Sequence, residues 1–317
     1  MDKASSPSAK QNVSYPEILQ SIGDQLKHRQ SSIVKRVALT SLPLIIAVVA
    51  LIFSDKIRQD LHFSDQVFTT YLVVFGILFL FALPWAVITN RIFRVERVIW
   101  IDSYFDKVAL SDNESWRLAI KLFWPNVIIS LLIFLRYYLI LVVLWIAAFT
   151  LYGFYVSQKM TDFQILVYII ALIAIPLTFA LYSFVVKVRL RYLLFVFLDM
   201  YRTPEFSYNS LFKEAIRINR VTKGDAFKKT LVTMLGAEAA ENAINVVASY
   251  MISASTSQLG GTGQAAGAAV GMAASEVAVA NRDYAEVTTF YIYYQVGRSI
   301  LYGDSQKVNQ NLYSLIK

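Results

Sequence analysis

Four ionisable side chains lie inside long apolar stretches of the sequence, where a charge is costly and therefore informative. They are Arg136, Glu238, Glu241 and Glu276. At 1.5 Å per helical residue, each lies about 13–18 Å from the nearer end of its apolar stretch. A charge near the centre of a bilayer costs at least about 2.5–3.5 kcal/mol on insertion scales, so it needs a partner or water. We therefore expect Arg136 to pair with one of the three glutamates.

Such an intramembrane polar cluster has two interpretations. It could relay protons or ions, or bind a polar substrate, as in transporters and channels. It could instead be a structural ion pair that fixes helix packing, with some carboxyl groups protonated. Glu238 and Glu241 are three residues apart and so fall on one helix face. The residue types alone leave both interpretations open.

Other catalytic chemistry finds no support in the sequence. There is no cysteine, which excludes disulfides, CxxC redox chemistry, cysteine-ligated zinc and a cysteine nucleophile. The two histidines, His28 and His62, are predicted on opposite sides of a membrane, so we expect no metal site and no cofactor. None of the HExxH, GxSxG, Walker A or GxGxxG patterns is present. The sequence thus favours a protein that is not an enzyme.

The elements that must position these residues are membrane helices. Apolar residues make up 56% of the 317 residues and charged residues 16%, whereas soluble domains carry about 25% charge. A membrane-spanning helix needs about 20 mostly apolar residues. The sequence predicts an all-α polytopic membrane protein with six such spans, at about 38–53, 68–89, 126–156, 163–186, 230–255 and 265–300. The last two are rich in Ala and Gly, and a soluble helical hairpin is the alternative for them.

Positive charge sets the predicted orientation, because Lys and Arg near spans stay on the cytoplasmic side. The segments before the first span, after the second and after the fourth hold six, six and ten Lys and Arg residues. The three other loops hold two, one and none. We expect a multi-pass protein of a prokaryotic plasma membrane, with both termini cytoplasmic. The first span begins only at residue 38, so it is expected to act as a signal anchor.

Three further segments are predicted outside the membrane. Residues 1–13 form a disordered cytoplasmic tail, and residues 304–317 form a second tail. Residues 14–36 form an amphipathic helix, in which Ser14 is the N-cap. This helix lies either on the inner leaflet or against other cytoplasmic helices.

Six basic residues follow the second and fourth spans and are expected to meet lipid phosphates at the inner interface. They are Arg91, Arg94, Arg97, Lys187, Arg189 and Arg191. The net charge of +8 follows from this distribution, and it indicates anionic lipid rather than nucleic acid as the partner.

The second and third inner segments resemble each other at an offset of about 97 residues. Each has a basic exit, an aromatic-rich helix with an aspartate (Asp102, Asp199), a polar turn and a helix containing Ala-Ile. The first of these last helices is predicted to begin with a capping box at Ser111. The two segments are either an internal repeat or a case of convergent interfacial composition.

Small residues recur every four positions on the sixth predicted span, at Gly263, Gly267, Gly271 and Ser275. Such a row lets another helix backbone approach closely. The packing partner is either another helix of the same chain or a second copy in a homo-oligomer.

Several residues of the last half resemble a pattern in a broad group of bacterial six-helix membrane proteins. They are Arg191, the Phe195–Asp199 stretch, Leu211–Ala215, Ile218, Lys223-Gly224, Phe227 and the aromatic pair Phe290-Tyr291. The group includes the DUF975-type proteins and the membrane domain attached to some glycerophosphodiester phosphodiesterases. The resemblance covers about residues 185–300 and implies a six-helix membrane fold, but no catalytic residues.

These observations favour a non-enzymatic integral membrane scaffold or accessory subunit that binds membrane lipid and a partner protein. The alternative is a transporter or channel that uses the cluster of Arg136, Glu238, Glu241 and Glu276.

Overall fold

The chain is all-α throughout the part that the structure describes. The computed structural model describes residues 13–52, 65–156, 177–222, 224–258 and 261–303, and no strand occurs among them. The prediction of an all-α fold is confirmed. The two predicted tails, apart from residue 13, and residues 163–176 of the predicted fourth span lie outside the described residues.

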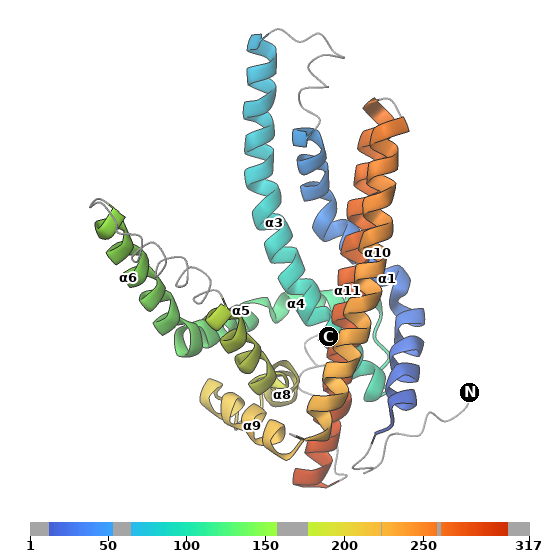
Figure 1. The fold of residues 1–317 in the computed structure, drawn as a ribbon. Coiled ribbons are helices and arrows are strands. Elements are labelled where there is room, and N and C mark those ends of the chain that lie inside the picture. Colours follow the sequence, from blue (N-terminus) through green and yellow to red (C-terminus); the bar gives the residue numbers. More distant parts are fainter. Residues whose placement is uncertain (1–12, 53–64, 157–176, 223, 259–260, 304–317) are drawn as a thin grey trace.

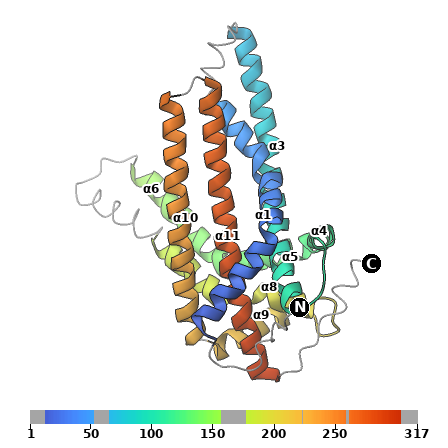
Figure 2. The same cartoon turned by 90° about the vertical axis from the view of Figure 1, so that its right-hand side faces the viewer.

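Four long helices lie side by side as rods and extend toward the same end of the molecule (Figure 1, Figure 2). They are α1 (Tyr15–Ile52), α3 (Asp65–Phe105), α10 (Asp225–Gln258) and α11 (Gly261–Tyr302). The helices α10 and α11 form an antiparallel hairpin, and α1 packs against both α11 and α3. Three short helices gather around the lower half of these rods in Figure 1: α4 (Asp112–Lys121), α8 (Leu193–Met200) and α9 (Tyr208–Val221).

A separate arm leads away from the rods (Figure 1). It consists of α5 (Phe123–Ile133), the π-helical turn η1 (Phe134–Tyr138) and α6 (Leu139–Val156). Pro125 lies in the first turn of α5, where a missing backbone N–H costs nothing. Residues 177–189 form a further helix that leads into α8.

The helices are more continuous than the sequence predicts. The amphipathic helix and the first span form one helix, α1, although Pro43 lies inside it. The second span likewise continues through Pro84 to Phe105 as α3. The helices of the fifth and sixth predicted spans also extend beyond the predicted bounds of 255 and 265, because α10 runs to Gln258 and α11 begins at Gly261.

The first half of α1 packs on neighbouring helices through its apolar face. Ile18, Ile22 and Ile33 are buried in the core. Leu19 and Val34 remain exposed on the other side. Of the two alternatives for residues 14–36, the structure therefore supports packing against other helices for the Ile18 face. Ser14 caps this helix as predicted, since its hydroxyl accepts from the Glu17 N–H at 3.4 Å.

The core is built from aromatic side chains where α3, α8 and α11 converge. Trp100, Phe195, Tyr284 and Tyr291 are all fully buried there. The Phe195 and Tyr291 rings meet edge to face with centroids 5.0 Å apart. Dense packing is thus found at the end of the rods that carries the short helices.

The apolar surface lies on the long helices instead. Among the described residues, two stretches are long and apolar enough to cross a membrane, Leu72–Phe105 and Phe123–Ala147. Their most apolar windows have mean hydropathies of 2.5 and 2.7, and only 6% and 11% of those windows is buried. The topology with six spans stays a prediction.

Candidate functional site

The structure corrects the expected pairing of Arg136. This residue lies in the π-helical turn η1, is exposed, and makes no ion pair with Glu238, Glu241 or Glu276, all of which the structure describes. Its guanidinium lies 5.5 Å from the centre of the Phe212 ring and 5.9 Å from that of Tyr137. The four residues therefore do not form one cluster, because the arm that carries Arg136 diverges from the α10–α11 hairpin (Figure 1).

Glu241 pairs with a different arginine. Its Oε2 lies 2.7 Å from Nη1 of Arg282 on α11, and Arg282 also lies 3.2 Å from Asp283. Asp283 in turn lies 3.2 Å from Nη1 of the buried Arg97 on α3. Two cations and two anions thus alternate across three helices. Glu238 and Glu276 are exposed and lie outside this chain of charges.

Sequence reasoning missed Arg282 because Asn281, Arg282 and Asp283 interrupt the apolar pattern, and the predicted cluster includes only ionisable residues within apolar stretches. A usable signal was present in the hairpin itself. Glu241 lies 17 residues before the end of α10 at Gln258, and Arg282 lies 21 residues after the start of α11 at Gly261, which is an offset of about one helical turn. In an antiparallel hairpin a long arginine side chain can reach across such an offset, so the opposite charges are natural partners.

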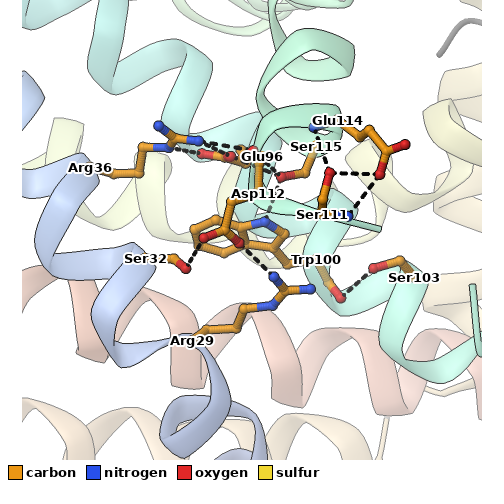
Figure 3. Close-up of polar contacts among 10 residues, drawn as sticks. All are labelled: Arg29, Ser32, Arg36, Glu96, Trp100, Ser103, Ser111, Asp112, Glu114 and Ser115. Carbon is orange, nitrogen blue, oxygen red and sulfur yellow. Dashed lines mark hydrogen bonds and ion pairs between the residues drawn. The ribbon is translucent and has the colours of Figure 1, made fainter. Parts of the chain in front are cut away.

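A second polar cluster joins α1 to α3 and α4 (Figure 3). Arg36 donates two hydrogen bonds of 2.9 Å to the two carboxylate oxygens of Glu96. Glu96 has a fully buried side chain, and it also accepts from the Ser115 hydroxyl at 3.0 Å. Trp100 Nε1 donates to that same hydroxyl at 2.8 Å. Bidentate geometry with an added donor is what a buried carboxylate requires.

The start of α4 adds further bonds to α1 (Figure 3). Asp112 Oδ1 accepts from Arg29 Nη1 at 2.8 Å, and its other oxygen accepts from Ser32. The predicted capping box at Ser111 is confirmed, since the Glu114 N–H donates to Ser111 Oγ at 3.3 Å. Hydrogen bonds from the Ser111 side chain and backbone lower the pKa of the Glu114 carboxyl below its usual range.

A third cluster pairs two aspartates with two tyrosines of α11. Asp102 on α3 accepts from the Tyr291 hydroxyl at 3.0 Å. Asp199 on α8 accepts from the Tyr294 hydroxyl and from the Arg298 guanidinium. The tyrosines are three residues apart, so both hydroxyl groups reach the same region from one face of α11. Burial raises the pKa of the Asp199 carboxyl, although Arg298 opposes this change.

Asp106 lies next to this third cluster, just beyond the end of α3. Burial raises the pKa of its carboxyl to about 6, and the negative charge of Asp199 adds to the effect. The positive charge of Arg298 acts in the opposite direction. The protonation of Asp106 therefore changes between pH 4 and pH 7.

The two segments of the predicted repeat share these features in the structure. Both continue into a helix with a serine capping box, at Ser111 and at Ser207. Each turn before that helix contains a basic residue with positive φ, Lys107 at 55° and Arg202 at 63°. With the two aspartate–tyrosine pairs, these similarities agree with an internal repeat.

The six basic residues expected at lipid phosphates fall into two groups. Arg91, Arg94 and Arg189 are exposed, and the Lys187 side chain is half-exposed, with Nζ 2.7 Å from Glu286. Arg97 is buried against Asp283, which corrects its predicted role at the lipid surface. Arg191 is also buried, so it can meet only a group that enters the protein.

Arg191 lines a narrow crevice between residues 177–189, the start of α10 and α11. The crevice has a volume of about 20 Å³. Its lining consists of Phe184, Lys187, Val188, Arg191, Thr230, Leu231, Met234 and Phe290. The lining is therefore largely apolar, with polar groups from three residues.

The row of small residues faces other helices of the same chain. Gly271 is buried, and Gly267 and Ser275 are half-buried on α11, which packs along α10 and α1. Burial of Gly271 within one chain supports packing inside the monomer. Gly263 lies in the first turn of α11, and its surroundings are outside the described part of the chain.

Metal binding has no candidate in the part of the chain that the structure describes, where no three His, Asp or Glu side chains come together as ligands. His28 is exposed on α1, and His62 lies outside the described residues. Comparison of the chain with protein-family models, with curated proteins and with solved structures finds no match.

Proposed function

We propose that this protein is a six-span membrane scaffold or accessory subunit, without enzymatic activity, that binds anionic lipid and a partner protein at the inner leaflet of a prokaryotic plasma membrane. The main support for the proposal is a distribution of side chains opposite to that expected of a soluble protein. Apolar residues are exposed along the long helices, whereas charged residues are buried at one end of them.

The exposed apolar surface is extensive and occurs on several helices. Phe81 on α3 is 72% exposed, Ile140 on α6 is 68% exposed and Val246 on α10 is 69% exposed. Soluble monomers rarely expose contiguous apolar patches of more than a few hundred Å². Lipid is the surrounding that makes such a surface favourable.

Basic side chains at the edge of this surface support a preference for anionic lipid. Arg91 and Arg94 are exposed where α3 passes from its apolar half into the aromatic core, and Arg189 is exposed where residues 177–189 end. Long basic side chains at such a boundary extend toward phosphates. Each contributes on the order of 1 kcal/mol near an anionic surface.

The buried charges support a structural role rather than catalysis. Arg36 is compensated by Glu96, and Arg282 by Glu241. Compensated pairs of this kind fix the relative positions of helices, as a docking platform requires. The resemblance of residues 185–300 to bacterial six-helix membrane proteins is consistent with this proposal.

The alternative of a transporter or channel depends on a cluster that includes Arg136. The described residues do not bring Arg136 near any of the three glutamates. The chain from Glu241 to Arg97 has two charges of each sign, which suits a fixed ion network. We therefore favour the scaffold.

A lipid-retention experiment tests the proposal. The protein is purified from a membrane with mixed lipids, and co-purified phosphatidylglycerol and phosphatidylcholine are measured by mass spectrometry. A triple variant with Arg91→Gln, Arg94→Gln and Arg189→Gln should retain less phosphatidylglycerol than the parent protein. The matched control replaces three exposed basic residues of α9, with Lys213→Gln, Arg217→Gln and Arg220→Gln. In Figure 1, α9 lies near the lower end of the molecule, away from the upper halves of the long helices.

The control triple should retain phosphatidylglycerol as the parent does. Equal retention by both triple variants and the parent, or no preference of the parent for the anionic lipid, would contradict the proposed lipid binding.

A further inference from the structure

Arg191 differs from Arg97, the other buried arginine of the described residues, and from the partly buried Arg36 and Arg298 in having no carboxylate partner among those residues. Arg36, Arg97 and Arg298 each contact an aspartate or a glutamate. Arg191 is only 8% exposed, and its guanidinium lies 4.7 Å from the centre of the Tyr192 ring and donates to the Thr222 hydroxyl at 3.4 Å. It also interacts with the hydroxyl groups of Tyr192 and Tyr293, and none of these groups is a carboxylate. A buried cation without an anion is strongly destabilising, so this arginine needs a negative partner.

Two hydrogen-bond donors of the crevice are also unused. Arg191 Nε and Thr230 Oγ1 are buried, and neither has a hydrogen-bond partner among the described residues. Both residues line the same crevice. Buried polar groups in folded proteins are nearly always bonded, so two unused donors in one crevice indicate an acceptor from outside the chain.

The charges around the crevice indicate that this acceptor is anionic. Lys187 is neutralised by Glu286, whose Oε1 lies 2.7 Å from its Nζ. The guanidinium of Arg191 is therefore left as a net positive charge in the lining. Phe184, Leu231 and Met234 supply an apolar wall beside it. A ligand with one anionic group and an adjoining apolar part matches this lining.

The size and position of the crevice further limit which ligands it could bind. A volume of about 20 Å³ is enough for one oxygen atom, since a single water needs about 10–15 Å³. Apart from Arg191 and from Phe290 of α11, the lining comes from the end of the helix at 177–189 and from the start of α10, which are the inner ends of the predicted fourth and fifth spans. In the proposed topology lipid phosphates lie at that depth, and the exposed Arg189 is close in sequence to Arg191.

We propose that this crevice binds one phosphate oxygen of an anionic phospholipid, with Arg191 Nε and Thr230 Oγ1 as the donors and the apolar wall against the upper part of an acyl chain. The site rests on the proposed membrane location and adds one specific lipid to it. Free phosphate offers the same oxygen without the acyl chain, so the experiment includes both.

Thr230→Val is the test variant, because valine keeps the shape of threonine and removes the hydroxyl. The matched control is Thr233→Val, one turn further along α10. Thr233 is also buried, but its hydroxyl donates within the helix to the Lys229 carbonyl at 2.9 Å, and it does not line the crevice. Delipidated protein in detergent is titrated with phosphatidylglycerol, phosphatidylcholine or inorganic phosphate, and the bound ligand is counted by native mass spectrometry.

The parent protein should bind one phosphatidylglycerol more tightly than any further copies. Thr230→Val should weaken that first binding by about tenfold, which corresponds to about 1.4 kcal/mol, while Thr233→Val leaves it unchanged. Lys187→Gln serves as a second variant: it removes the cation 2.7 Å from Glu286 and so adds one net negative charge beside the crevice, which should also weaken the first binding.

Three other outcomes would contradict the proposed site, the proposed lipid binding or the identity of the ligand. If Thr230→Val binds the first phosphatidylglycerol as the parent does, while the parent still prefers that lipid, the crevice is not the site although the proposed function stands. If the parent shows no preference for phosphatidylglycerol, the crevice site and the proposed lipid binding both fail. If inorganic phosphate competes with the lipid with the same dependence on Thr230, the anion is not a lipid.

Discussion

Glu241 on α10 and Arg282 on α11 face each other across the helical hairpin, with Oε2 and Nη1 2.7 Å apart. Glu241 is buried, and its other carboxylate oxygen accepts from Asn245 Nδ2 at 3.5 Å, while Arg282 also contacts Asp283. The pair fixes the register of two long helices that otherwise meet through small residues. Arg282 is thus the partner of Glu241, whereas the sequence alone suggests Arg136 as the partner of one of the three glutamates.

Removal of Arg282 should therefore destabilise the protein strongly. Arg282→Leu leaves Glu241 buried without its cation, with only the 3.5 Å hydrogen bond from Asn245, at a cost of roughly 3–5 kcal/mol. Adding Glu241→Gln should recover part of that loss. Arg136→Leu is the control, since Arg136 is exposed and its guanidinium lies near the rings of Tyr137 and Phe212. Thermal unfolding in detergent measures all four proteins. Equal losses for Arg282→Leu and Arg136→Leu would show that the hairpin pair is not what stabilises Glu241.

A close approach between α9 and α11 should make Gly297 intolerant of substitution. A Cβ atom at this position would lie 2.7 Å from Ile218 Cγ2 and 2.9 Å from Thr222 Cγ2. Gly297→Ala should thus cost about 1–3 kcal/mol, because the two helices must separate. Gly236→Ala on α10 is the control: nothing lies within 4 Å of its added methyl group, and alanine favours a helix over glycine. The melting temperature should fall for the first variant only.

Asp106 should make the protein less stable as the pH rises from 4 to 7. Its carboxyl has a pKa of about 6 in the folded protein, raised by burial and then by Asp199, against an ordinary value of about 3.8. The folded state thus binds this proton more tightly than the unfolded state. The resulting stabilisation is complete below pH 4 and is lost as the pH passes 6.

The variant Asp106→Asn should remove that part of the pH dependence. Its melting temperature should equal or exceed that of the parent at pH 7, and the difference between the two should change between pH 4 and pH 6. Glu205→Gln, which neutralises an exposed carboxylate, provides the control for the change in net charge. A parallel pH profile for Asp106→Asn and the parent would contradict the assignment.

The sequence predicts helices well here because local signals determine them. The caps at Ser14 and Ser111 and the amphipathic pattern of residues 14–36 all have counterparts in the structure. Partners between helices are harder to predict, since they depend on which helices are neighbours. Arg136 and Glu241 have similar depths in their apolar stretches, but the arm carrying Arg136 diverges from the hairpin, and depth alone contains no information about that divergence.

The buried arginines show the same limit. Arg91, Arg94 and Arg97 recur every three residues and look equivalent in the sequence, yet Arg97 is turned toward Asp283 while the other two are exposed. In a helix of 3.6 residues per turn, side chains three residues apart point in directions that differ by about 60° around the helix axis. The third arginine of the row therefore faces a different neighbour from the first. The position of α11 decides which member is buried.

The central claim is a six-span membrane topology with the short helices on the cytoplasmic side, and accessibility of introduced cysteines tests it most directly. The natural chain has no cysteine, so single substitutions at Asn209, exposed on α9, and at Ser257, near the end of α10, give clean signals. An impermeant maleimide applied to intact cells should label Ser257→Cys and leave Asn209→Cys unlabelled until the membrane is permeabilised. Labelling of both positions in intact cells, or of Asn209→Cys alone, would contradict the topology.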